Sequence, residues 1–127
     1  MIFHLALASE WQAGWRVGRY TPACFAHDGF VHCCDDAATT LKVAATYFSG
    51  ATEPVLVAEL DETALDVELR REAPAPPDGK PHAHHAGACF PHVYGSVPAR
   101  AVVRIGRLQR DSQGAWCWPS EWSYGKP

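Results

Sequence analysis

The chain has 127 residues, of which 47% are hydrophobic and 20% are charged. These proportions exclude a disordered segment or a coiled coil, so we expect residues 1–127 to form a single globular domain. Eleven basic and 14 acidic residues give a formal net charge of −3, which argues against a nucleic-acid partner. The first residues have no basic region, and no apolar run approaches about 20 residues. The sequence therefore predicts a cytoplasmic protein with no membrane partner.

The N-terminal segment alternates in a way that is typical of a β-strand. We expect this strand over residues 2–7, with opposite faces formed by alternate side chains. Ser9 then fits the first position of a capping box, so the next element is expected to be a helix. Trp11 and Trp15 would share one face of this helix, and Gly18 is the expected stop.

The middle of the chain carries the clearest helix signal. Asp28 and Gly29 predict a turn into a short strand over residues 30–34. Asp35 or Asp36 can cap a following helix whose apolar residues recur at helical spacing. Further strands are expected over residues 55–60, 67–69 and 101–107, with a hairpin turn at 111–114 and its partner strand at 116–118.

Two segments stand apart from these elements. Residues 73–88 contain four prolines and three histidines, which is typical of a long loop. Residues 116–127 form a tryptophan-rich C-terminal segment. Because strands precede and follow two main helices, the expected fold class is α+β.

Histidine is the unusual component, with seven copies. His4, His32 and His92 all lie in strand-like segments, where a buried imidazole must be hydrogen-bonded or face a cleft. Three such histidines favour one shared pocket over three separate core positions. Glu72 is the carboxylate best placed to enter that pocket, because it borders the long loop. We therefore take these four residues as candidate catalytic residues.

A second histidine group offers an alternative chemistry. His82, His84 and His85 are followed by Cys89, and these residue types bind zinc, copper or nickel. Their spacing does not match a structural zinc pattern, so a solvated loop is favoured and metal binding is retained as an alternative. The five cysteines have no repeating spacing and are expected to be free thiols.

Several short segments, taken together, resemble a known family. The chain is similar to the uncharacterised bacterial family called domain of unknown function 952. That family usually has Ser where this chain has Cys34. The matching residues and segments, in the family's order, are Ile2-Phe3-His4, Trp11, Tyr20-Thr21-Pro22, Gly29-Phe30-Val31-His32-Cys33, Arg71-Glu72, Phe90-Pro91-His92-Val93-Tyr94-Gly95 and Ala101-Val102-Val103.

The resemblance extends, at the level of fold, to the ADP-ribosyltransferases. It implies a split or curved antiparallel-rich sheet, with NAD as a substrate and no tightly bound cofactor. By this resemblance His4 would bind ribose, His32 would take the second-strand position against nicotinamide, and Glu72, His92 or Tyr94 would orient the reacting carbon. Substrate-binding residues on the same basis are His4, Tyr20, Cys33 and Tyr94.

These observations leave three functions open. The first is an ADP-ribosyl-type transferase that takes NAD, ADP-ribose or another nucleotide. The carboxylate usual in such transferases is not evident in the sequence. This absence favours a second hypothesis, that the protein is a catalytically silent binding module for a small molecule. The third is a metal-binding protein that uses the histidine-rich loop.

Overall fold

A computed structural model describes residues 1–74 and 89–125 of the chain. The described residues combine helices with strands, and every strand pairing is antiparallel, so the expected mixture of elements is confirmed. The helices are α1 (Ala8–Ala13), α2 (Phe25–Asp28) and α3 (Ala37–Tyr47). The strands are β1 (Ile2–Leu7), β2 (Trp15–Arg16), β3 (Arg19–Tyr20), β4 (Val31–His32), β5 (Val55–Leu60), β6 (Glu68–Glu72), β7 (Phe90–Tyr94), β8 (Val97–Pro98), β9 (Val102–Arg107), β10 (Gln109–Arg110), β11 (Trp116–Cys117) and β12 (Trp122–Tyr124).

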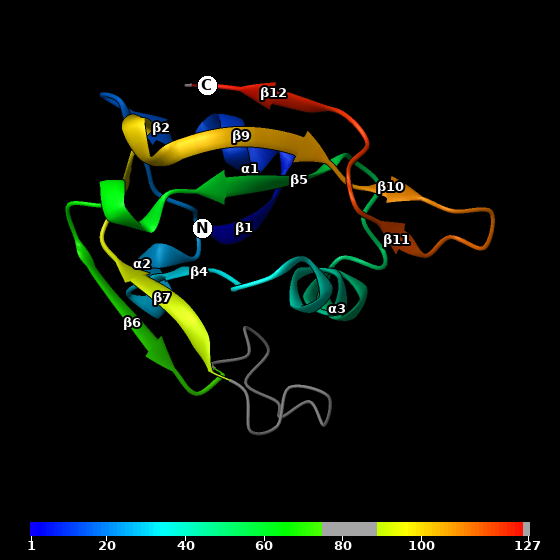
Figure 1. The fold of residues 1–127 in the computed structure, drawn as a ribbon, viewed down its shortest axis with the longest axis horizontal. Helices are drawn as coiled ribbons and strands as arrows, with labels where there is room; N and C mark the ends of the chain where they lie inside the picture. Colours follow the sequence, from blue (N-terminus) through cyan, green and yellow to red (C-terminus); the bar gives the residue numbers. More distant parts are fainter. Residues whose placement is uncertain (75–88, 126–127) are drawn as a thin grey trace.

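The strands are divided among several sheets, where the sequence predicted one split or curved sheet. The largest sheet has the order β1-β5-β9-β12, and a three-stranded sheet has the order β4-β7-β6 (Figure 1). The other pairings are a sheet of order β2-β3-β8 and a hairpin formed by β10 and β11. A single antiparallel bridge between Phe3 and Cys34 connects the free edge of β1 to the segment that follows β4. The two larger sheets therefore meet along β1.

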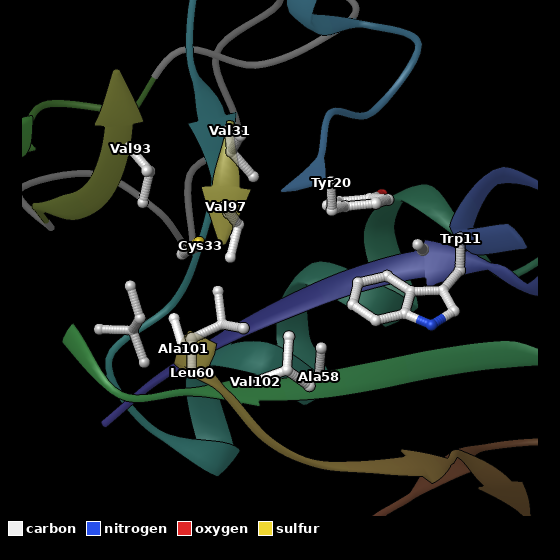
Figure 2. Close-up of a cluster of buried hydrophobic side chains, with 12 residues drawn as sticks. Trp11, Tyr20, Val31, Cys33, Ala58, Leu60, Val93, Val97, Ala101 and Val102 are labelled. Atoms are coloured by element: carbon white, nitrogen blue, oxygen red, sulfur yellow. The ribbon is translucent and has the colours of Figure 1, made fainter. Parts of the chain in front are cut away.

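Strand β1 separates two hydrophobic clusters because its side chains alternate as predicted. Ile2 and Ala6 are buried in the first cluster, which Figure 2 shows with Trp11 and Tyr20 beside the valines of neighbouring strands. Phe3, Leu5 and Leu7 pack on the second cluster, together with α3 and three tryptophans of the C-terminal segment. The strand thus holds polar His4 against the first cluster.

The predicted first helix is wrong in its boundaries. It begins at Ala8, directly after β1, and Ser9 is not its cap, since the backbone N–H of Ser9 donates to the Glu53 carboxylate at 2.8 Å. The helix ends with Gly14 as its C-cap and not at Gly18, and position 14 requires glycine because a Cβ there would lie 2.5 Å from the Tyr20 ring. Trp15 consequently lies in β2, although its ring still contacts the Trp11 ring.

The third helix agrees with the prediction. Asp36 caps α3, and its side chain accepts a hydrogen bond from the backbone N–H of Thr39 at 2.7 Å. The single-turn helix α2 was not predicted, so three helices replace the expected two. It ends at Gly29, whose φ of 79° is in the left-handed region that favours glycine.

Some predicted features are only partly covered by the structure. Most of the expected loop over residues 73–88, including His82, His84 and His85, lies outside the described residues. Cys89 is described and exposed, and the chain's cysteines, all five of them described, form no disulfide. Within residues 1–74 and 89–125, no helix is long and apolar enough to cross a membrane.

Candidate functional site

One pocket of about 320 Å³ collects most of the predicted site residues. Its lining includes residues of β1, α1, β3, β4, α3 and β7, so the pocket lies between the two larger sheets and the third helix. Glu72 and Tyr94 lie behind the lining, where Glu72 contacts His92 and Tyr94 contacts Glu72. The predicted residues that line the pocket are His4, Tyr20, His32, Cys33 and His92.

His4 connects three strands through its ring. Its Nδ1 lies 2.7 Å from the main-chain oxygen of His32 on β4, and its Nε2 lies 3.0 Å from the hydroxyl of Tyr20 on β3. A carbonyl oxygen can only accept, so Nδ1 carries the proton. In the neutral ring Nε2 must then accept from the Tyr20 hydroxyl. Both nitrogens of His4 are therefore satisfied by the protein.

The electrostatics of this pair follow from burial. His4 is 5% exposed, and burial lowers its pKa to about 4, which keeps the ring neutral at neutral pH. Burial also raises the pKa of Tyr20, with a further contribution from the negative charge of Glu10. The Tyr20 hydroxyl is therefore protonated and able to donate to His4.

His32 is held by a carboxylate that lies four residues earlier in the chain. Its Nε2 donates to Asp28 at 2.8 Å, and the second oxygen of Asp28 accepts from His27 at 2.9 Å. Burial alone would raise the pKa of Asp28, but hydrogen bonds from the two imidazoles outweigh it and lower that pKa. The carboxylate is thus ionised and fixes the His32 ring through Nε2.

His92 is held in the same way by a different carboxylate. Its Nδ1 donates to Glu72 at 2.9 Å, and the Tyr94 hydroxyl donates to the same oxygen. Both hydrogen bonds lower the pKa of Glu72, and the bond from Tyr94 has the larger effect. Burial lowers the pKa of His92, partly offset by the bond to Glu72. The Phe30 ring stacks on the imidazole, with ring centroids 4.0 Å apart.

The two carboxylate-held imidazoles are neighbours. His32 and His92 are directly opposite in the register of β4 and β7, and their ring centroids are 5.7 Å apart. Among the described residues, neither the Nδ1 of His32 nor the Nε2 of His92 has a hydrogen-bond partner. Each ring therefore has one nitrogen anchored by a carboxylate and a second without a partner among the described residues, an arrangement suited to proton transfer.

The buried thiols of the pocket are unreactive by comparison. Burial raises the pKa of Cys33 well above that of a free thiol and raises the pKa of Cys34 to about 12. Both side chains therefore remain protonated at neutral pH and contribute shape to the pocket rather than a nucleophile.

Among the contributors to the site that sequence reasoning missed are Asp28, Phe30 and Glu10. Asp28 was interpreted only as a turn residue, and its position four residues before His32 was the available signal. Phe30 was assigned to the strand of His32 but not to the site, and Glu10 was placed in the first helix without a role in the pocket. No three His, Cys, Asp or Glu side chains are grouped to hold a metal ion in the part of the chain that the structure describes.

Comparison with known proteins places the chain in a family. The family model described as "Protein of unknown function (DUF952)" matches residues 5–105. The chain belongs to the DUF952 family. No significant match was found among the curated proteins.

Solved structures share the fold of this DUF952 chain. Two X-ray structures of protein CC0527 from Caulobacter crescentus, one a double mutant, are 26% and 25% identical, with TM-scores of 0.71. Both cover 91% of this chain and 92% of that chain. A solution NMR structure of CC0527 is 27% identical, covers 89% of this chain and 88% of that chain, and has a TM-score of 0.65. None of the three is described as an ADP-ribosyltransferase, so that more distant relationship stays a prediction.

Proposed function

We propose that the pocket binds NAD or a related ADP-ribosyl nucleotide and catalyses transfer of the ribosyl group from its nitrogen leaving group. One observation carries this proposal: histidines from three strands line one pocket, and two of them are each anchored by a carboxylate through one nitrogen, the other nitrogen having no partner in residues 1–74 and 89–125. Such paired groups are typical of acid–base catalysis rather than of a packed core.

The chemistry needs little more than orientation and proton transfer. The bond between the ribosyl carbon and the nicotinamide nitrogen breaks, and its electron pair goes to the nicotinamide, which becomes neutral. An acceptor hydroxyl, from water or an alcohol, forms the new bond to the ribosyl carbon. Its proton passes to the free Nε2 of His92, and the Glu72 carboxylate stabilises the resulting imidazolium.

The other polar residues of the pocket hold either the protein or the substrate in position. His4 uses both nitrogens within the protein, so we assign it the role of holding Tyr20 and β4 in place rather than proton transfer. His32 presents its Nδ1 beside His92 and supplies a hydrogen-bond acceptor for a ribose hydroxyl. The Tyr20 oxygen keeps a lone pair for the same purpose, because its proton is donated to His4.

The test measures, by chromatography, how fast nicotinamide is released from NAD. The wild-type protein is expected to release nicotinamide, and His92→Asn is expected to slow release by about a hundredfold or more. Gln113→Ala, in the turn between β10 and β11, is a folded control outside the pocket and should match the wild type. Binding of NAD in calorimetry without release would favour the catalytically silent module, and equal rates in His92→Asn would contradict the proposal.

A further inference from the structure

The lining of the pocket has an unusual balance of side chains. Five aromatic rings contribute to it, yet its described residues include no Lys or Arg. The aromatic residues are Phe3, Tyr20, Tyr47, Phe48 and Phe90. Aromatic faces carry partial negative charge, so they attract a cation and offer nothing to a phosphate.

Carboxylates add to this negative field. Glu10 on α1 lines the pocket, is half-buried, and has no hydrogen-bond or salt-bridge partner for its side chain within residues 1–74 and 89–125. Asp28 lies behind His32, and Glu72 lies behind His92. The charge of Glu10 reaches the pocket, because it contributes to the raised pKa values of Tyr20 and Cys24 after the larger effect of burial.

A buried acceptor marks where a ligand would bind. The His92 side chain is only 3% exposed and lines the pocket, and its Nε2 has no partner among the described residues. The pocket volume of about 320 Å³ is at the low end of the range for small-molecule sites, so it fits a nucleoside better than a whole dinucleotide.

From these observations we infer that the pocket selects a flat aromatic nitrogen cation, such as the pyridinium ring of an N-glycosyl nucleoside. Any diphosphate of a larger substrate then lies outside the described lining. The inference rests on the proposed function, since the pyridinium is the leaving group of that reaction. It adds that affinity comes from the cationic ring and Glu10, not from phosphate.

Calorimetry with four probes separates these contributions. The probes are 1-methylnicotinamide, nicotinamide riboside, the same riboside with its ring reduced and uncharged, and ADP-ribose. The wild type is expected to bind the two pyridinium compounds about tenfold or more tightly than the reduced riboside or ADP-ribose. Glu10→Gln is expected to weaken the pyridinium compounds about fivefold and to leave the reduced riboside unchanged. Glu121→Gln is the matched control, because it removes one exposed carboxylate outside the pocket.

The outcomes distinguish this inference from the proposed function. If ADP-ribose or the reduced riboside binds as tightly as the pyridinium riboside, or if Glu10→Gln behaves like Glu121→Gln, the inference is overturned while the transferase proposal stands. If 1-methylnicotinamide binds in a Glu10-dependent manner but no riboside or nucleotide does, the cation pocket stands and the transferase proposal fails. Absence of binding by all four probes overturns the inference, and absence of nicotinamide release from NAD overturns the transferase proposal.

Discussion

The histidines on the two walls of the pocket differ in how many of their ring nitrogens are hydrogen-bonded to the protein. On the β1 wall, His4 is buried and both of its ring nitrogens are bonded to the protein, to the His32 carbonyl and the Tyr20 hydroxyl. On the β4–β7 wall, His32 and His92 each have one nitrogen anchored by a carboxylate and the other without a partner among the described residues. A polar group whose capacity is used up inside the protein stabilises the fold, whereas one left half-satisfied at a pocket is available to a ligand. We therefore assign structure to the first wall and chemistry to the second.

Replacing His4 is expected to cause the largest loss of stability. His4→Ala is expected to lower the free energy of unfolding by about 4 kcal/mol, because it leaves a cavity and removes the buried partners of the Tyr20 hydroxyl and the His32 carbonyl. His32→Ala is expected to cost about 1 kcal/mol, since its side chain is 28% exposed. Urea denaturation measures both, and an equal cost for the two variants would contradict the assignment.

Low pH is expected to destabilise the fold through protonation of His4. The pKa of His4 is about 4 when folded and 6.5 in the unfolded chain, so between these values the unfolded state binds more protons. The free energy of unfolding should therefore fall as the pH is lowered from 6.5 to 4, by about 3 kcal/mol from His4 alone. Thermal denaturation across this window checks it.

Two variants separate the His4 contribution from general destabilisation. His4→Gln removes the titrating ring and should show about 3 kcal/mol less acid loss than the wild type. Val57→Ala creates a cavity in the core elsewhere and should keep the wild-type pH dependence at lower stability. If His4→Gln keeps the full pH dependence, the buried neutral imidazole is not its source.

The β4–β7 wall should respond in activity rather than in stability. Glu72→Gln removes the charge that stabilises protonated His92, so nicotinamide release is expected to fall about tenfold with little change in thermal stability. Glu68→Gln is a suitable control on the same strand, because Glu68 pairs with Arg70 at the surface. An unchanged rate in Glu72→Gln would remove that carboxylate from the mechanism.

Tyr94 is expected to give the smallest effect. Its hydroxyl donates to Glu72 and is the largest cause of the lowered pKa of that carboxyl. Tyr94→Phe should therefore raise the pKa of Glu72, as followed by carbon-13 NMR of the side-chain carboxyl, and lower the free energy of unfolding by under about 1 kcal/mol. An unchanged pKa of Glu72 in Tyr94→Phe would mean that the Tyr94 hydroxyl does not donate to this carboxylate in solution.

Local patterns in the sequence were sufficient for the longer elements. The alternation in β1 predicted which side chains share a face, and Asp35 or Asp36 followed by helical spacing predicted α3. The strand context of His4, His32 and His92 also pointed to one pocket, because a polar ring in an apolar strand needs a partner or a cleft.

The shorter elements depend on contacts that no local pattern contains. Strands of two residues, such as β2 and β3, exist because Tyr20 packs against Gly14 and pairs with Trp15. The tight turn between them places Val17 at a φ of 51°, which a β-branched residue rarely adopts, so propensity argued against a turn there. The hydrogen bond between Asp28 and His32 depends in turn on the unpredicted helix α2.

The most direct test of the two-wall account is nitrogen-15 NMR of the imidazole rings during titration with nicotinamide riboside. The account predicts that the resonances of His32 Nδ1 and His92 Nε2 shift with ligand, while both nitrogens of His4 keep their free-protein values. Shifts confined to His4, with His32 and His92 unchanged, would contradict it.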